Sequence, residues 1–353
     1  AACARRRSAQ RNAAPPLEAT RGWSGMMPRP RIVVTQRIHS EVAALLESEG
    51  ELLVNPAPEP WPDAELRAHA ALADALMVFM PDHIDEAFLA GCPRLKVIAA
   101  ALKGYDNFDV EACTRRSIWF TIVPDRLTEP TAELALALML ALARNVLPGD
   151  RLIRSGQFRG WRPMLYGRSL YGAIVGIIGY GAVGKALACL LQPFQARVLT
   201  YDTNDEPAAL DCLLRESDFV VPLLPLTPST LHFLNADRLR AMKPGSFLVN
   251  VGRGSVVDEQ AVAAAIASGH LGGYAADTFE MEDWARPDRP TEIAGGLLAS
   301  DRTVFTPHLG SAVGEARLEI ERLAAMSIVQ ALRGHIPERA VNSAIDTLTK
   351  KEC

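Results

Sequence analysis

The sequence predicts an α/β protein with two doubly wound parallel-sheet domains. Short β-branched runs alternate with amphipathic stretches, and this alternation occurs in two blocks that Pro124 separates. A length of 353 residues is enough for two domains with a core each. The cleft between the two sheets is then the expected place for a site, because open sheets bind ligands beyond the carboxyl ends of their strands.

The first block runs from residue 31 to residue 123 and contains three clear strand signals. Strands are expected at 32–34, 76–79 and 97–100, and helices at 40–49, 85–90 and 109–115. After Pro124, residues 131–143 predict a helix that is apolar nearly all round. Such a helix is buried, either between domains or in a subunit interface.

The second block predicts six strands, at 174–178, 197–201, 219–223, 246–251, 274–276 and 303–305. Helices are expected at 185–191 and 211–216, and a last amphipathic helix at 313–333. We expect this last helix to return to the first domain, which would make that domain discontinuous. The predicted boundaries are 28–127 with 308–346 for the first domain and 128–307 for the second.

The composition excludes several classes of protein. A net charge of -4 gives no overall attraction to nucleic acid or to a membrane surface, and no apolar run is long enough to span a bilayer. The six cysteines show neither a C-x-x-C pair nor metal-ligand spacing, which is typical of free thiols in a reducing cytoplasm. We therefore expect a cytoplasmic protein with no metal site, no nucleic-acid partner and no membrane.

Residues 1–27 differ from the rest of the chain. They are rich in Arg, Ala, Ser and Pro, and Glu18 is their single acid, which resembles the composition of a transit peptide. The alternative is an over-long start, with the protein beginning at Met26 or Met27. We favour the second interpretation, since no apolar face organises the arginines, and we expect an unstructured extension.

A glycine motif in the second block predicts a dinucleotide site. Gly179, Gly181 and Gly184 form G-x-G-x-x-G between a strand and a helix, which is the context that separates this motif from a structural glycine turn. Asp202 ends the next strand, where a carboxylate would accept both ribose hydroxyls and repel a 2′-phosphate. The sequence therefore favours NAD over NADP, and the alternative for Asp202 is a solvated acid at a strand end.

Two further residues follow strands of the second block. Arg253 stands between Gly252 and Gly254, which let the backbone approach a ligand. Its guanidinium can bind an oxyanion through two parallel hydrogen bonds. His308 follows Pro307 at a strand end. Either residue alone is more commonly structural, but both lie at the carboxyl edge of the same predicted sheet, where an imidazole can move a proton while a nicotinamide takes a hydride.

Four segments, 179–184, 251–255, 277–282 and 306–308, resemble the D-isomer specific 2-hydroxyacid dehydrogenase superfamily. The resemblance extends from residue 31 to about residue 342. It implies a flavodoxin-like substrate domain, a Rossmann NAD domain, a homodimer packed partly through residues 131–143, and a catalytic set of Arg253, Glu282 and His308. The cofactor contacts that it implies are Gly179, Gly181, Ala182, Val183, Gly184, Asp202, Thr131, Pro225, Val251, Asp277 and Gly310.

Other segments resemble the phosphonate dehydrogenases, the NAD-dependent phosphite oxidases within this superfamily. They are residues 79–82, 101–109, 161–166 and 279–290. Phosphite carries close to two charges, so burying it calls for a second cation beside Arg253, and Lys103 would supply it. The substrate contacts implied are Lys103, Gly104, Met80, Tyr166 and Ser311, with Trp161 and Trp284 excluding water; the aromatic residues could instead pack in a core or an interface.

The resemblance assigns His308 as the general base for a water that adds to phosphorus, with Glu282 holding the imidazole, and leaves room for Arg253 to assist the proton transfer. Two alternatives remain: reduction or oxidation of a small 2-oxo or 2-hydroxy acid such as glyoxylate or hydroxypyruvate, and a non-enzymatic NAD-sensing corepressor. The chain is also shorter than its relatives after Asp202, by about the length of one strand and its turn. We expect this loss to trim an edge of the nucleotide sheet and to weaken NAD binding.

Overall fold

The computed structural model describes residues 29–343. Its first sheet has five parallel strands in the order β2-β1-β3-β4-β5, which is the flavodoxin-like order. The strands are β1 (Arg31–Val34), β2 (Glu51–Val54), β3 (Ala75–Val78), β4 (Val97–Ala100) and β5 (Trp119–Thr121). The helices that follow them are α1 (Ser40–Glu49), α2 (Asp63–Ala70), α3 (Glu86–Ala90) and α4 (Val110–Arg115).

The second sheet has six parallel strands in the order β11-β10-β9-β8-β6-β7. They are β6 (Ile174–Ile178), β7 (Arg197–Tyr201), β8 (Phe219–Pro222), β9 (Phe247–Asn250), β10 (Gly273–Ala276) and β11 (Thr303–Phe305). The helices are α5 (Thr128–Ala143), α6 (Val146–Arg154), α7 (Ala182–Leu191), α8 (Pro207–Glu216), α9 (Ala236–Ala241), α10 (Glu259–Ala267) and α11 (Gly295–Leu298), with short 3₁₀ turns η1 (Gln192–Phe194), η2 (Gly254–Val256) and η3 (Glu280–Glu282). The prediction of two doubly wound parallel-sheet domains is confirmed.

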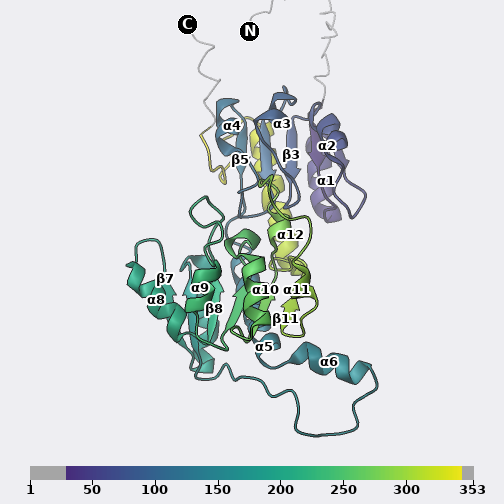
Figure 1. Ribbon diagram of the computed structural model, residues 1–353. Helices are drawn as coiled ribbons and strands as arrows, with labels where there is room; N and C mark the ends of the chain where they lie inside the picture. Colours follow the sequence, from purple (N-terminus) through teal and green to yellow (C-terminus); the bar gives the residue numbers. More distant parts are fainter. Residues whose placement is uncertain (1–28, 344–353) are drawn as a thin grey trace, which may run out of the picture.

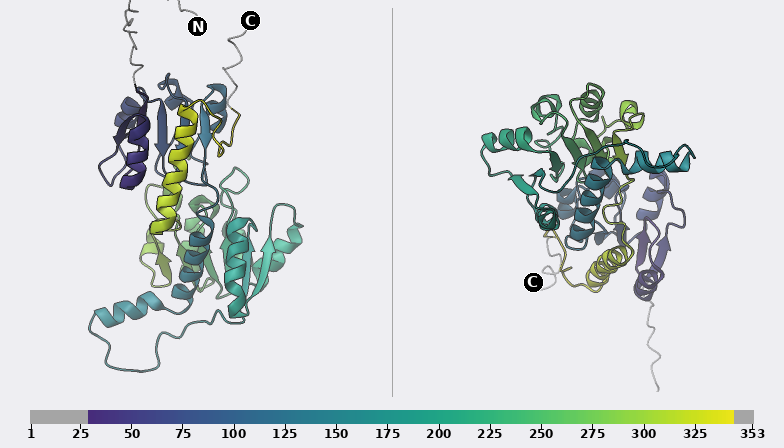
Figure 2. Two further views of the ribbon diagram at one scale, coloured as in Figure 1. Left: turned by 180° about the vertical axis from the view of Figure 1, so that it is seen from behind. Right: turned by 90° about the horizontal axis from the view of Figure 1, so that it is seen from below.

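Each sheet is covered by helices on both faces, which explains why its central strands are continuous apolar runs. On one face of the second sheet, α5 and α7 share a core with β6, β8 and β9, and α8, α9 and α10 enclose the other face. The last helix, α12 (Gly314–Leu332), packs against α1, β3 and β4 of the first sheet although it follows the second sheet in sequence. Figure 1 shows this helix descending from the first sheet, and Figure 2 shows it from behind.

Helix α5 begins at Thr128, earlier than the sequence suggests, because Pro130 lies in its first turn. The amide groups of that turn have no intrahelical acceptor, so a proline there removes no hydrogen bond. Strands β2 and β5 are also additional to the prediction. β2 is an edge strand and only partly buried, and β5 has three residues, so neither has a strong apolar signature.

The second sheet ends at β7, with α8 following after a short turn. The usual doubly wound order places a further strand outside this position. The loss of an edge strand after Asp202, which the sequence predicts, is therefore seen in the structure. The effect of this loss on NAD affinity stays a prediction.

Helix α6 and the loop that follows it, up to β6, extend away from the second sheet on the side far from the first sheet (Figures 1 and 2). Within residues 29–343, no single helix is long and apolar enough to cross a membrane; α5 and α6 reach the required length only as a pair bent by 64°. The predicted extension of residues 1–27 lies outside the described residues.

Candidate active site

The carboxyl edges of the two sheets meet at Arg253. This residue follows β9, and its Nε donates to Asp106 Oδ1 at 2.9 Å from the loop after β4. Both side chains are about 15% exposed. A Cβ added to Gly104 would lie 1.5 Å from Arg253 Nη2, so the guanidinium occupies the space that a side chain at Gly104 would need. The structure thus brings Arg253 and Gly104 together, as expected.

The backbone around Arg253 is also fixed. Asn250 Nδ2 donates to Arg253 O at 2.9 Å, and Asn250 Oδ1 accepts from Gly252 N at 3.1 Å. Gly254 is needed because its Cα faces the Phe279 peptide, where a Cβ would approach the carbonyl carbon to 1.9 Å. The turn that carries Arg253 therefore rests directly on the turn that precedes Glu282.

His308 and Glu282 form the predicted pair. His308 Nδ1 lies 2.6 Å from Glu282 Oε2, and Glu282 Oε1 accepts from Phe279 N at 2.9 Å. Both side chains are just over a quarter exposed. His308 has a φ of +56°, a left-handed conformation that a non-glycine residue adopts only when its surroundings enforce it. With Nδ1 committed to Glu282, Nε2 is the nitrogen that remains to act on a ligand.

Asp277 is the residue that enforces this conformation. Its carboxylate is 1% exposed and accepts from Thr306 Oγ1 at 2.6 Å, Leu309 N at 2.7 Å and Gly310 N at 2.9 Å. Gly310 in turn lies beside Thr131, whose Oγ1 is 3.3 Å from Gly310 O. Three of the predicted cofactor residues, Thr131, Asp277 and Gly310, thus lie together, and Asp277 also holds the loop that carries His308.

The glycine motif has the geometry of a dinucleotide turn. Gly179 has a φ of +95°, and a Cβ there would meet Leu223 O at 2.6 Å. Gly184 packs against Gly179 O, while Gly181 faces open space. Gly181 begins α7 without a side-chain cap, so the amides of Ala182 and Val183 are available to a phosphate. These residues fit the pyrophosphate of NAD.

Asp202 directly follows β7 and lies at the same edge as the glycine turn, because β7 pairs with β6. Its oxygens accept from Thr203 N at 2.7 Å and Tyr180 N at 2.9 Å, and these two hydrogen bonds lower the pKa of the carboxyl group. The acid is therefore held as an anion beside the turn. Of the other predicted cofactor residues, Val251 is buried and Pro225 is exposed, with its carbonyl accepting from Thr230 Oγ1.

Lys103 lies next to Gly104 and is partly buried. Among the described residues, no carboxylate lies within 4 Å of its ammonium group, in contrast to Arg253. Met80 belongs to the loop after β3, where Asn107 Nδ2 donates to Met80 O at 3.1 Å. Ser311 follows Gly310 and is partly buried, and Trp284 is 41% exposed with Arg289 over its ring at 4.3 Å.

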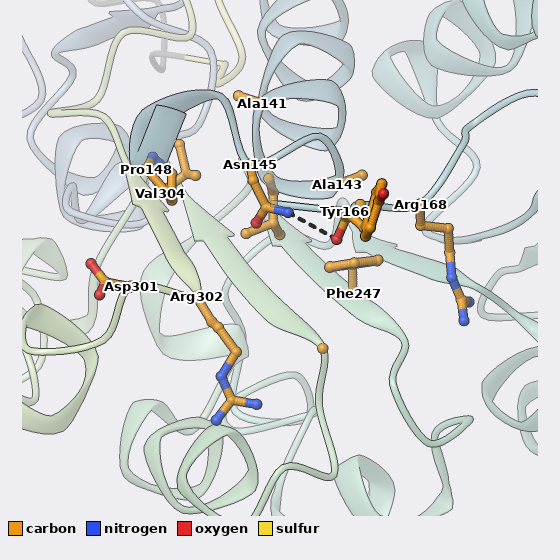
Figure 3. Close-up of a pocket in the computed structure, with 13 residues that line it drawn as sticks. Ala141, Ala143, Asn145, Pro148, Tyr166, Arg168, Phe247, Asp301, Arg302 and Val304 are labelled. Carbon is orange, nitrogen blue, oxygen red and sulfur yellow. Dashed lines mark hydrogen bonds between the residues drawn. The ribbon is translucent and has the colours of Figure 1, made fainter. Parts of the chain in front are cut away.

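The structure does not bring Trp161 and Tyr166 to this site within one chain. Their exposed fractions are 88% and 82%, and they lie on the loop after α6. Tyr166 borders a separate cavity, where Asn145 Nδ2 donates to its carbonyl at 3.3 Å (Figure 3). Phe247 and Arg302, at the amino ends of β9 and β11, line the same cavity, so it lies at the edge of the sheet opposite to Arg253. The predicted roles of Tyr166 in lining the substrate pocket and of Trp161 in excluding water therefore stay predictions, since within one chain both residues lie away from Arg253.

Sequence reasoning did not select several residues that the structure places in or behind the site. They are Asp106, Asn107, Glu280 and Arg286. Asp106 and Asn107 could have been noticed, because an acidic and an amide side chain follow Gly104 closely in sequence. Their partners Arg253 and Ala285, however, lie more than 140 residues away. Within residues 29–343, no group of three His, Cys, Asp or Glu side chains is arranged to hold a metal ion.

Comparison with known proteins places this site in a family. Residues 136–310 match the model of the D-isomer specific 2-hydroxyacid dehydrogenase NAD binding domain. The glyoxylate reductase of Pyrococcus furiosus is 36% identical over 337 residues, which cover 91% of this chain and 98% of the relative. This chain belongs to the D-isomer specific 2-hydroxyacid dehydrogenase family.

Solved structures agree with the family assignment. The TT0316 protein from Thermus thermophilus is 35% identical with a TM-score of 0.82, covering 88% of this chain and all of that chain. The NADPH-dependent glyoxylate/hydroxypyruvate reductase from Sinorhizobium meliloti, in complex with NADP and malonate, is 28% identical with a TM-score of 0.74, covering 86% of this chain and 93% of that one. As a member of this family, the chain is an NAD-dependent oxidoreductase.

Proposed function

We propose that this dehydrogenase oxidises phosphite to phosphate with NAD as the hydride acceptor. The proposal is carried by two cationic residues that adjoin Gly104: the Arg253 guanidinium lies against it, and Lys103 precedes it in sequence. Arg253 is already paired with Asp106, so these two side chains together add little net charge. Lys103, which precedes Gly104 and has no acidic partner within the described residues, would add a net positive charge on this side of the cleft. An anion with close to two charges gains more from this second cation than a carboxylate with one charge does.

The side chains then have distinct roles. Arg253 and Lys103 would bind the phosphite oxygens, and Gly104 would allow them to approach closely. His308 Nε2 would take a proton from the water whose oxygen adds to phosphorus, while Glu282 holds Nδ1. NAD, when bound, accepts the hydride that leaves phosphorus. Phosphite, water and NAD thus give phosphate, NADH and one proton.

A second candidate is the reduction of glyoxylate or hydroxypyruvate. The names of the relatives favour it, since several archaeal glyoxylate reductases are 33–36% identical over about nine-tenths of this chain. Arg253, Glu282 and His308 would serve here as well. Arg253 would bind a carboxylate, and His308 would protonate a carbonyl oxygen. The two candidates differ chiefly in their need for Lys103.

A direct comparison of substrates tests the proposal. The purified protein with NAD is given phosphite or D-glycerate, and with NADH it is given glyoxylate or hydroxypyruvate, while NADH absorbance is followed. We expect turnover with phosphite to exceed turnover with the carbon acids by a large factor. Efficient glyoxylate reduction without any NADH formation from phosphite would establish the second candidate and refute the first. The variant His308→Asn serves as the inactive control in every assay.

We also propose a homodimer, in which α5, α6 and the following loop contact a second copy. The loop and α6 expose large apolar side chains, among them Val146, Ile153, Trp161, Tyr166 and Tyr171, and such a patch is typical of an interface. A substrate role for Trp161 or Tyr166 then requires that they come from the partner. Light scattering should give twice the 38.2 kDa chain mass, and a monomer at micromolar concentration would refute this arrangement.

A further inference from the structure

A cluster of polar residues, most of them buried, lies directly behind Arg253 and Glu282. We call it the Arg286 cluster, and it consists of His232, Ser255, Glu259, Glu280, Asp283 and Arg286. All four of its residues between 255 and 283 are at most 5% exposed, and the Arg286 side chain is 14% exposed. None of its members is part of the binding or proton-transfer groups described above.

Arg286 is the link between the two turns that carry those groups. Its Nη1 donates to Ser255 Oγ at 2.6 Å and to Glu280 Oε2 at 3.0 Å. Ser255 comes two residues after Arg253, and Glu280 comes two residues before Glu282. One guanidinium nitrogen therefore connects the turn of the substrate-binding arginine to the turn of the acid that holds His308.

The other members make the link rigid. His232 Nε2 lies 2.7 Å from Glu280 Oε2, and His232 N donates to Ser255 O at 2.7 Å, so His232 repeats the connection that Arg286 makes. Asp283 Oδ2 accepts from Ser255 N at 2.8 Å. Every polar group of Ser255 is thus bonded to a residue near Glu280 or to His232, and the turn cannot shift alone.

Arg286 compensates the charge of buried carboxyl groups. Glu280 Oε1 accepts from Glu259 N, and Glu259 Oε1 accepts from Glu280 N, so two carboxylates lie close together. Burial raises the pKa of Glu259 and of Asp283. Arg286 is the permanent cation in this group, since the guanidinium stays protonated at all ordinary pH values. Its loss would leave His232 as the remaining cationic partner of Glu280 in the cluster, and would leave the two turns joined by fewer bonds, those of His232 and Asp283.

The same segment also reaches across the cleft. Ala285 N donates to Asn107 Oδ1 at 3.2 Å, and Asn107 Nδ2 donates to Met80 O. A shift of residues 280–286 would therefore also disturb the loop that contains Met80. This connection predicts an effect on substrate binding in addition to an effect on turnover.

We propose that Arg286 is a positioning residue, which sets the separation of Arg253 from the Glu282–His308 pair through its bonds to Ser255 and Glu280. The inference rests on the proposed roles of Arg253, Glu282 and His308 but not on which substrate they act upon. It also gives a physical reason for the unusual segment 279–290, whose charged residues fold back behind the site.

The experiment compares Arg286→Gln and Arg286→Lys with a matched control, Arg302→Gln. Arg302 is an arginine of the same sheet domain that donates to the carbonyls of Ile266 and Leu271, at the sheet edge opposite to Arg253. Steady-state constants are measured with NAD and with whichever substrate the unmodified enzyme turns over, and the melting temperature is recorded for each variant. An unmodified enzyme that is inactive on every substrate refutes the proposed function rather than the inference.

For Arg286→Gln we expect kcat/KM for the substrate to fall roughly 10- to 100-fold, as for a misplacement on the order of 1 Å, with KM for NAD within about twofold of normal. Arg286→Lys should recover part of the loss, because an ammonium can still donate to Glu280. Arg302→Gln should lower the melting temperature and leave the kinetic constants unchanged.

Should Arg286→Gln fail to fold, Ser255→Ala provides the test, since it removes only the hydroxyl that Arg286 contacts. This variant should fold and show a smaller loss of kcat/KM for the substrate, of a fewfold, again with KM for NAD unchanged. Wild-type kcat/KM in Ser255→Ala or in Arg286→Gln would overturn the inference. So would a set of Arg286 variants that change only the melting temperature, as the Arg302 control does.

Discussion

Replacement of Gly104 by alanine is the sharpest perturbation that the site offers. A Cβ at this position would lie 1.5 Å from Arg253 Nη2 and 2.6 Å from Cζ. Ordinary contact begins at 3.4 Å, so the end of the guanidinium must withdraw by roughly 2 Å. The main chain is not the source of the problem, because Gly104 does not have a positive φ.

The displacement falls on contacts that orient Arg253. Its Nε is bonded to Asp106 at 2.9 Å, and a shift of roughly 2 Å breaks a hydrogen bond of this length. A charge-assisted hydrogen bond to the substrate is worth about 1.5–3 kcal/mol, and a misplacement of about 1 Å can lower the rate on the order of 100-fold. We therefore expect kcat/KM for the substrate to fall about 100-fold in Gly104→Ala.

The assay measures initial rates over a range of substrate concentrations at saturating NAD, and then over a range of NAD concentrations. KM for NAD should stay unchanged, since the glycine turn at Gly179 follows β6, which β8 separates from the strand that carries Arg253. Gly295→Ala is the matched control, because a Cβ there meets nothing within 4 Å. Unchanged kcat/KM in Gly104→Ala would refute the conclusion that Arg253 must lie against this glycine to bind the substrate.

The charged groups of the chain give three more tests. Lys103→Ala should raise the substrate KM roughly 10- to 100-fold. Lys96→Ala is the control, because it removes an exposed lysine paired with Asp74, and it should leave the substrate KM unchanged. A normal substrate KM in Lys103→Ala would exclude the two-cation site. Asp202→Ala should weaken NAD binding by about 1–3 kcal/mol and improve the use of NADP. If the unmodified enzyme used NAD and NADP with equal kcat/KM, the role of Asp202 in selecting NAD would be contradicted. Burial raises the pKa of Asp82 from 3.8 to about 6. Between these two pH values the folded state keeps a proton that the unfolded state releases, so this group lowers the free energy of unfolding by about 3 kcal/mol as the pH rises from one value to the other. Asp82→Asn should abolish that decline in denaturant unfolding, and an unchanged decline would refute the assignment.

The sequence is most informative where strands are buried on both faces. The central strands β4 and β6 begin and end where the apolar runs predict. The edge strand β2 and the short helices α9, α10 and α11 could not be predicted with equal success, because their positions depend on packing against partners that are distant in sequence.

The candidate catalytic residues follow the same logic. Arg253 and His308 could be placed at one sheet edge, because the carboxyl ends of parallel strands lie together, and Glu282 came from the family motif. The pairing of Arg253 with Asp106 and the Arg286 cluster depend on loop conformations, which the strand pattern does not specify. The predicted substrate roles of Trp161 and Tyr166 stay open, because the sequence does not say whether their loop approaches its own chain or another.

The identity of the hydride donor is tested most directly by isotope transfer. Phosphite that carries deuterium on phosphorus is incubated with the purified protein and NAD, and the NADH formed is analysed by mass spectrometry. The two-cation site predicts NADH with one deuterium per molecule and an equal amount of phosphate. NADH without deuterium, or no NADH at all from an enzyme that reduces glyoxylate, would contradict phosphite oxidation.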